Sequence, residues 1–303
     1  MRPMSIHAVI HRYGLCMLNV TRLQVFASVA RHTSVTRAAQ ELHYAQPSVS
    51  HHLARLEEEV GLKLVERVGR GIRLTPDGEL LARRATEILA RLESAEDELA
   101  ARAGLRTGRV RVAGFQSVLS TVVSQAAARL NASSPGIEIT LTDLHPDLAL
   151  EQLRDGSIDV AVVFRYDDDV PDDLAFTHLF DDPMCLISLE PHQTLADHRD
   201  SPWIAGCERC RKEMLDACQT AGFTPRIAYT SDDHMVEQSL VAAGLGVTTI
   251  PALALQTYRA AGIHASEVPT FTRRISVATF GGPPHAPATD AFLQALSRTT
   301  AQV

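Results

Sequence analysis

The sequence is poor in cysteine, in aromatic residues and in long apolar runs. It has five cysteines among 303 residues and an aromatic content of 5%. Five is too few, and an odd number, for the disulfide framework of a small secreted protein. No apolar run approaches the roughly 18 residues that a membrane-spanning helix needs. We therefore expect neither a transmembrane segment nor a membrane partner.

The first residues lack the features of a signal peptide. Their apolar stretch is interrupted by His7, His11, Arg12 and Tyr13, and no A-x-A-like cleavage site follows it. Residues 1–17 are therefore predicted to be an N-terminal extension, with Met17 as an alternative start. Together with the sparse cysteines, this pattern favours a cytoplasmic protein.

Motifs of common enzyme classes are also missing. The sequence has no G-x-S-x-G, no P-loop and no H-E-x-x-H, the patterns of hydrolases, nucleotide-binding proteins and zinc proteases. The segment GFQSVLS contains a serine without the flanking glycines of a nucleophile elbow. We predict that the protein is not an enzyme and needs no cofactor.

One pair of cysteines, Cys207 and Cys210, has CxxC spacing, with Cys218 eight residues further on. A structural zinc site normally has four ligands, and no second CxxC follows, so no metal site is predicted. A redox switch through the pair is one alternative. Ordinary buried or surface thiols are the favoured interpretation.

Charge is distributed unevenly along the chain. Residues 1–107 contain 15 Lys and Arg against 12 Asp and Glu, a balance of +3, whereas residues 108–303 contain 14 against 24, a balance of −10. A mildly basic N-terminal third on an acidic body indicates that contact with a polyanion is confined to the N-terminal part.

Three helical apolar patterns follow one another between residues 18 and 61. In the third, Pro47 lies near the start, Val49, Leu53, Leu56 and Val60 form the buried face, and Gly61 ends the helix. This order is that of a helix-turn-helix, whose second helix enters the major groove of DNA. Side chains that can bond base edges or phosphates lie on its outer surface or in the preceding helix: Thr36, Arg37, Gln46, Ser48, Ser50, His51, His52 and Arg55.

Two short strands are predicted after this helix, around the turn Gly69-Arg70-Gly71. They form a wing that places Arg67, Arg70 and Arg73 to reach phosphates, which position a protein on DNA without specifying sequence. A three-helix bundle with solvated polar faces would share many of these single features. The ordered combination of helices, proline and basic wing is more specific.

A long helix follows, beginning with Thr75 as N-cap and Pro76 in the first turn. Its apolar residues recur at spacings of four and three, which is the seam of a coiled coil: Leu81, Ala85, Ile88, Leu92, Ala95 and Leu99. We predict that this seam forms a homodimer or higher homo-oligomer. Packing of the helix on its own domain is the alternative.

From residue 108 onward, short strands alternate with helices, a pattern that predicts parallel sheets with crossover helices and two α/β lobes. Near the end of the chain, GIHASEV and RRISVATFG are predicted as two separate strands. Ligands of such sheets bind outside the carboxyl ends of strands and at helix N-termini. These positions give the candidate effector-binding residues: Gln116, Ser117, Phe164, Arg165, Ser231, Asp232, His234 and Gly246. Each also has a structural explanation, such as a helix cap, an ion pair or a tight turn.

Residues 23–81 closely resemble the winged helix-turn-helix of LysR-type transcriptional regulators. The family motifs match at Ala38, Ala39, Gln46, Pro47, Val49, Ser50, Leu56, Glu57, Val60, Gly61, Arg67, Leu74, Thr75 and Gly78. One departure is Ala45, where the family often has a Ser or Thr that caps the helix. The segment SDDHMVEQSLVAAGLGVTTIPALAL is similar to the effector domain of the same family, and the resemblance covers about Leu18 to Ser297.

The resemblance implies a fold with three parts, each with its own role. It implies an α-helical winged helix-turn-helix over 18–75, a linker and dimerisation helix over 76–104, and an effector-binding domain over 108–303. This last domain would be a two-lobed α/β fold like the type 2 periplasmic binding proteins, with lobe I over 108–164 and 269–303 and lobe II over 165–268.

The expected function is that of a DNA-binding transcriptional regulator controlled by an unidentified small-molecule effector. Its expected partners are promoter DNA, the effector, further copies of the chain and RNA polymerase. A cysteine-based redox regulator and a constitutive DNA-binding protein with a C-terminal assembly module remain alternatives. So does a solute-binding or enzymatic α/β protein with an incidental N-terminal bundle.

Overall fold

The computed structural model describes residues 18–68, 71–102, 108–166, 170–283 and 285–301. The chain divides into two compact units: the first contains the described residues up to Leu99 together with Arg154–Ser157, and the second contains the rest. The predicted N-terminal extension lies outside the described residues. Among those described, no helix combines the length and the apolar character needed to cross a membrane.

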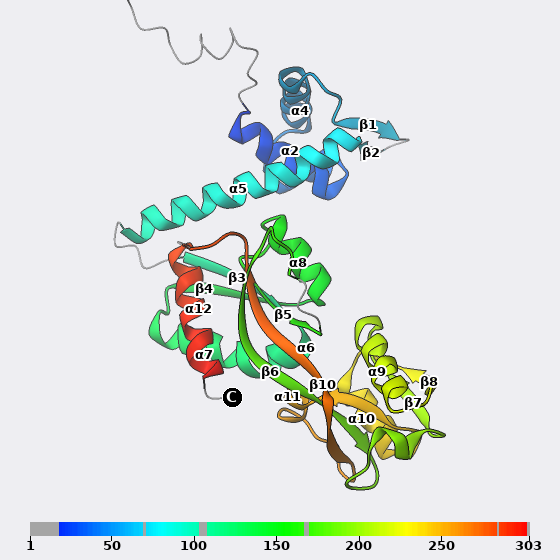
Figure 1. Ribbon diagram of the computed structural model, residues 1–303. Helices are drawn as coiled ribbons and strands as arrows, with labels where there is room; N and C mark the ends of the chain where they lie inside the picture. The colour runs from blue at the N-terminus through cyan, green and yellow to red at the C-terminus, as the bar shows by residue number, and fades with distance from the viewer. Residues whose placement is uncertain (1–17, 69–70, 103–107, 167–169, 284, 302–303) are drawn as a thin grey trace, which may run out of the picture. The chain divides into compact units, whose positions relative to one another are not determined.

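The first unit is a helix bundle with a two-stranded wing, followed by a long helix (Figure 1). Its elements are α2 (Val20–His32), α3 (Val35–Glu41), α4 (Gln46–Val60), β1 (Val65–Val68), β2 (Gly71–Leu74) and α5 (Pro76–Arg102). The two wing strands pair antiparallel, with Val65 opposite Leu74 and Val68 opposite Gly71. This order confirms the winged helix-turn-helix predicted from the sequence.

Helix α4 has the buried face that its apolar spacing predicts. Val49, Leu53 and Leu56 are buried, and they pack with the α3 pair Ala38 and Ala39. Alanine at both α3 positions removes bulk between the helices, so the backbones can approach closely. Ala45 precedes α4 in extended conformation and provides no side-chain cap, so the departure from the family pattern leaves this helix start without a capping hydroxyl.

The junction between α4 and the wing is held by the buried carboxylate of Glu57. Glu57 accepts hydrogen bonds from the backbone N–H groups of Leu64 (2.9 Å) and Val65 (3.3 Å) and pairs with Lys63 Nζ at 2.6 Å. Burial acts to raise the pKa of Glu57, but the hydrogen bonds from Lys63 and the two N–H groups outweigh burial and leave that pKa lowered. Glu57 therefore stabilises the turn as a carboxylate.

The start of α5 packs directly on this junction. Thr75 Oγ1 donates to the carbonyl oxygen of Lys63 at 2.6 Å and accepts from the N–H of Gly78 at 3.0 Å. A Cβ atom on Gly78 would lie 2.0 Å from the carbonyl oxygen of Leu64. The Leu-Thr-x-x-Gly motif thus allows the backbone of a helix to touch the backbone of the junction that precedes the wing.

The second unit consists of two α/β lobes. Its first lobe begins with β3 (Gly108–Gly114), α6 (Gln116–Val118), the π-helical turn η1 (Leu119–Val123) and α7 (Ser124–Ser133). The elements that follow are β4 (Ile137–Asp143), α8 (Pro146–Arg154), β5 (Val160–Arg165), β6 (Ala175–Ser188), η2 (Leu195–His198), β7 (Pro202–Ala205), α9 (Glu208–Thr220), β8 (Arg226–Thr230), α10 (His234–Ala242), β9 (Thr248–Pro251), α11 (Ala252–Leu255), β10 (His264–Thr279) and α12 (Pro287–Thr300). In the first lobe α7 and α12 lie side by side (Figure 1), over a core that includes Val112, Phe164 and Phe292.

The predicted parallel pairing holds for only part of the sheet structure. The large sheet has the strand order β4-β3-β5-β10-β6-β9, in which β4, β3 and β5 are parallel whereas β10 and β6 run antiparallel to their neighbours. A separate sheet pairs β7 and β8 in parallel. The mixed arrangement arises because two long strands carry the chain from one lobe to the other and back, in opposite directions.

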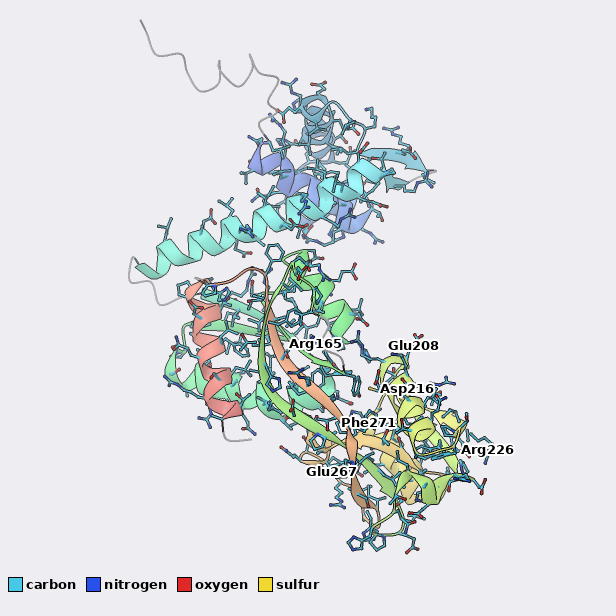
Figure 2. The ribbon with its side chains drawn as sticks, viewed as in Figure 1. Arg165, Glu208, Asp216, Arg226, Glu267 and Phe271 are labelled. Carbon is cyan, nitrogen blue, oxygen red and sulfur yellow. The ribbon has the colours of Figure 1, made fainter. Side chains whose placement is uncertain are left out.

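These two strands also define the boundary between the lobes. GIHASEV and RRISVATFG belong to one strand, β10, instead of the two that were predicted. Its residues 264–267 pair with the end of β6 and its residues 272–279 with the start, and the irregular stretch between them includes Phe271 (Figure 2). Leu174 and Phe176 pack in the first-lobe core, so the chain enters the second lobe along β6, later than the sequence analysis places the crossing at residue 165.

Candidate functional site

The side chains proposed to contact DNA lie at the surface of the first unit. Arg70 lies outside the described residues. All the others are exposed or half-exposed: Thr36, Arg37, Gln46, Ser48, Ser50, His51, His52, Arg55, Arg67 and Arg73. They come from α3, from the outer side of α4 and from the wing, which is the distribution that groove and backbone contacts require. Their contacts to DNA remain a prediction.

Several of these side chains already have partners within the unit. Gln46 Nε2 donates to Ser50 Oγ at 3.0 Å, and Arg55 pairs with Glu58 at 2.7 Å. The ring of Tyr44 stacks on His52 with centroids 6.0 Å apart. Tyr44 is an exposed aromatic residue in the turn before α4 that the sequence analysis did not select. Exposed pairs of this kind contribute little to stability, so DNA can replace them at small cost.

The predicted dimer seam divides into two parts. Leu81 and Ala85 pack against Leu23 and Ala27 of the same unit, and Ala85 is fully buried. For these two residues the structure agrees with the alternative of packing on the chain's own domain. The other four residues of the seam are exposed: Ile88, Leu92, Ala95 and Leu99. The apolar surface that remains open therefore belongs to the second half of α5.

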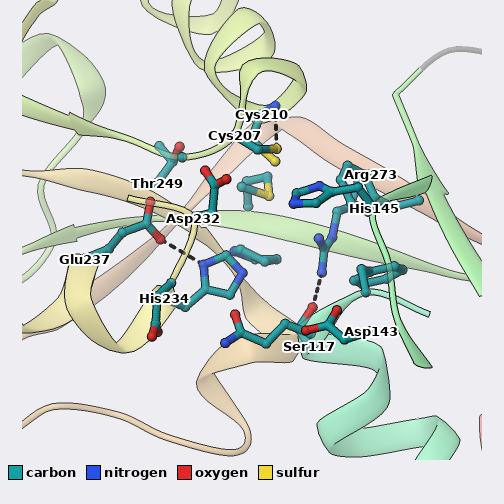
Figure 3. Close-up of a pocket in the computed structure, with 17 residues that line it drawn as sticks. Ser117, Asp143, His145, Cys207, Cys210, Asp232, His234, Glu237, Thr249 and Arg273 are labelled. Carbon is teal, nitrogen blue, oxygen red and sulfur yellow. Dashed lines mark hydrogen bonds and ion pairs between the residues drawn. The ribbon is translucent and has the colours of Figure 1, made fainter. Parts of the chain in front are cut away.

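A cavity of about 250 Å³ lies between the two lobes of the second unit (Figure 3). Its walls come from the start of α6, the ends of β4 and β5, the starts of α9 and α10, and the strands β6, β9 and β10. Its described lining residues are Phe115, Gln116, Ser117, Asp143, His145, Phe164, Met184, Gly206, Cys207, Cys210, Asp232, Asp233, His234, Glu237, Thr249, Pro251 and Arg273. This is the position at which open α/β sheets bind ligands.

Five of the eight candidate effector-binding residues line this cavity: Gln116, Ser117, Phe164, Asp232 and His234. The remaining three, Arg165, Ser231 and Gly246, have structural roles instead. Successive side chains of a strand point to opposite faces, so Arg165 lies over the ring of Phe176, 5.3 Å from its centroid, whereas Phe164 lines the cavity.

Ser231 and Gly246 lie in the turns before α10 and β9, where each has a structural role and does not line the cavity. Ser231 Oγ accepts from the N–H of Asp233 at 3.1 Å and so shapes the start of α10. A Cβ atom on Gly246 would lie 2.5 Å from the carbonyl oxygen of Pro202, so this glycine permits close packing beside β7. Neither Ser117 nor Asp232 caps a helix, because Phe115 and Asp233 occupy those positions.

Arg273 was not predicted from the sequence, although its side chain combines an ion pair, a hydrogen bond and two ring contacts at the cavity. Its side chain is 2% exposed and pairs with Asp182 Oδ2 through Nε at 2.9 Å and Nη2 at 2.7 Å. Nη2 also donates to Ser117 Oγ at 2.7 Å, and the guanidinium lies over the rings of Phe115 and Phe164. Asp143 and His145 were also missed, although they lie at the carboxyl end of β4 just as Phe164 lies near the carboxyl end of β5.

The carboxylate of Glu237 is buried against His234, whose Nδ1 lies 2.8 Å from Glu237 Oε2 (Figure 3). Burial raises the pKa of Glu237, and the hydrogen bond with His234 partly opposes this shift. Asp143 and Asp232 are exposed in the cavity. Among the described residues, no group of three or more His, Cys, Asp or Glu is arranged to hold a metal ion.

Two family models match the chain. The model described as "LysR substrate binding domain" matches residues 103–301, and the model described as "Bacterial regulatory helix-turn-helix protein, lysR family" matches residues 20–79. The substrate-binding model covers the two-lobed second unit with its cavity, and the helix-turn-helix model covers the winged helix-turn-helix. Together they account for most of the chain.

Individual proteins show the same likeness. The HTH-type transcriptional regulator CfxR of Cupriavidus necator is 35% identical over 148 residues, which is 49% of this chain and 46% of CfxR. The probable HTH-type transcriptional regulator LrrA of Synechococcus elongatus is 27% identical over 293 residues, covering 94% of this chain and 99% of LrrA. Full-length CbnR, solved in complex with its target DNA, has the same fold, with a TM-score of 0.65, 22% identity, and coverage of 93% of this chain and 100% of CbnR.

Proposed function

The chain belongs to the LysR family of bacterial regulatory helix-turn-helix proteins, and we propose that a small molecule in its interlobe cavity controls its binding to promoter DNA. One observation carries this proposal: a winged helix-turn-helix with polar, exposed α3 and α4 surfaces and a 250 Å³ cavity between two lobes occur in the same chain. The family consists of regulators, so we propose that the cavity binds its ligand without converting it.

Coupling between the two units requires that the effector bind one assembly state more tightly than another. We propose that the protein acts as a homo-oligomer in the cytoplasm, where promoter DNA lies. Its subunits would pair through the exposed apolar residues in the second half of α5, Ile88, Leu92, Ala95 and Leu99. Pairing of two subunits presents two recognition helices to a two-fold symmetric site.

Replacing Arg55 with alanine is expected to weaken specific DNA binding by about 1–3 kcal/mol while the protein stays folded. Arg55 is exposed on α4, and its pair with Glu58 is a surface interaction of little energetic value. Fluorescence anisotropy with the upstream DNA measures the loss, and circular dichroism checks the fold.

Arg84→Ala provides the matched control. Arg84 is also exposed, and it pairs with Glu87 at the same i,i+3 spacing and the same 2.7 Å distance as Arg55 with Glu58. This variant is expected to bind the duplex as the wild type does. Equal affinity of a folded Arg55→Ala variant and the wild type would remove Arg55 from the reading surface.

A further inference from the structure

Two thiols lie together at the edge of the interlobe cavity. Cys207 is the N-cap of α9, and its Sγ accepts a hydrogen bond from the backbone N–H of Cys210 at 3.5 Å. Both residues line the cavity and neither forms a disulfide (Figure 3). Cys207 is half-buried, so its sulfur is sheltered by the protein and still accessible from the cavity.

The surroundings of the two sulfurs assign them different protonation states. The hydrogen bond from the Cys210 side chain, together with the Cys210 N–H and nearby His145, lowers the pKa of Cys207 to about 6, although burial and Asp232 act in the opposite direction. The same hydrogen bond and burial raise the pKa of Cys210. At neutral pH Cys207 is therefore a thiolate and Cys210 a neutral thiol that donates to it.

The other described cysteines have pKa values shifted in the opposite direction from that of Cys207. Burial raises the pKa of Cys185 to about 11 and that of Cys218 to about 12. Thiolates are the nucleophilic form of cysteine, so Cys207 is the described cysteine best suited to react with a carbon electrophile.

The remaining walls of the cavity suit an uncharged organic molecule. Phe115, Phe164 and Met184 provide apolar surface. The cavity's arginine, Arg273, is neutralised by its buried pair with Asp182, and the exposed carboxylates of Asp143 and Asp232 disfavour an anionic ligand. An uncharged molecule meets none of this repulsion and can lie against the aromatic wall.

We propose that Cys207 is the attachment point for a small, uncharged carbon electrophile of the α,β-unsaturated carbonyl class that enters the interlobe cavity and alters DNA binding. The Cys207 thiolate adds to the β-carbon, so a C–S bond forms and the C=C π bond breaks. The released electron pair moves to the carbonyl as an enolate, whose α-carbon then takes a proton from Cys210 or water. If Cys210 supplies that proton, it regains one from solvent, and no oxidant or reductant is consumed.

The first test measures the rate of addition, using N-ethylmaleimide on the full-length protein and peptide mapping by mass spectrometry. At pH 6 Cys207 is expected to react about ten times faster than the cysteine of a short reference peptide, because a larger thiolate fraction outweighs the lower basicity of its sulfur. Its rate is expected to be half-maximal near pH 6, and Cys210→Ala is expected to move that midpoint to higher pH. A Cys207 rate equal to that of the reference peptide would overturn the proposal.

The second test measures DNA affinity before and after treatment, and it rests on the proposed function. The adduct is expected to change the dissociation constant at least about fivefold, whereas Cys207→Ser is expected to show the same affinity with and without the reagent. A complete adduct with unchanged affinity would overturn the proposal, as would an effect confined to peroxide treatment and a Cys207–Cys210 disulfide. Absence of DNA binding before treatment would count against the proposed function. The addition rates measured in the first test would still show whether Cys207 has the expected reactivity.

Discussion

Replacing Asp182 with asparagine is expected to lower the free energy of unfolding of the second unit by about 3–5 kcal/mol, the usual cost of removing one partner from a buried ion pair. Asp182 and Arg273 are each 2% exposed at the side chain. Asp182 Oδ1 also accepts from the N–H of Leu253 at 2.9 Å. Asparagine can keep this last bond, but its amide N–H groups then face the guanidinium N–H groups and leave a buried charge without a counterion.

Chemical denaturation of the full-length protein, followed by the fluorescence of its tryptophan, Trp203, measures this effect, because Trp203 is buried in the second lobe. Asp181→Asn is the matched control, since the neighbouring carboxylate is 61% exposed and lies 3.4 Å from His178. The control is expected to change the free energy by less than about 0.5 kcal/mol. Similar losses for both variants would show that the Asp182–Arg273 pair does not hold β6 and β10 together.

Replacing Gly78 with alanine is expected to destabilise the first unit by about 1–3 kcal/mol and to reduce DNA binding with it. Alanine in a helix normally stabilises relative to glycine by roughly 0.5–1 kcal/mol, so the expected sign is reversed. The reversal arises because the new Cβ would lie 2.0 Å from the carbonyl oxygen of Leu64. That atom belongs to the backbone, so relief of the clash requires α5 to move away from the junction between α4 and the wing.

Gly71→Ala is the control within the same unit. A Cβ atom there would meet no atom closer than 3.8 Å, which is an ordinary contact. Hydrogen exchange of the backbone amides in α2, α4 and the wing reports stability of the first unit separately from the second. If these amides are as well protected from exchange in the Gly78→Ala variant as in the wild type, the glycine is not required for the close packing of α5 on Leu64.

Features encoded by neighbouring residues were predictable from the sequence. The apolar spacing of Val49, Leu53 and Leu56 gave the inner face of α4, and Gly61 gave its end. The helix-strand alternation placed Gln116 and Asp232 at a cavity, because ligand sites follow the carboxyl ends of strands. The family and its fold class were predicted correctly on these local motifs.

Features set by distant partners were not predictable. Arg273 is separated from Asp182 by 91 residues and from Ser117 by 156, so no local pattern marks it as part of a cavity. The antiparallel course of β10 depends on its pairing with β5 and β6, which strand propensity does not encode. The seam of α5 was misjudged at Leu81 and Ala85 because an a/d spacing suits a partner helix and the chain's own α2 equally well.

The most direct test of the central claim is fluorescence anisotropy of the purified full-length protein with the DNA upstream of its own coding region and with a scrambled duplex, across a series of salt concentrations. A LysR-family regulator is expected to bind the upstream duplex more tightly, with an affinity that falls steeply as salt increases because phosphate contacts release counterions. Absence of binding to either duplex at low salt would contradict DNA binding by the winged helix-turn-helix, and with it the proposed control of transcription.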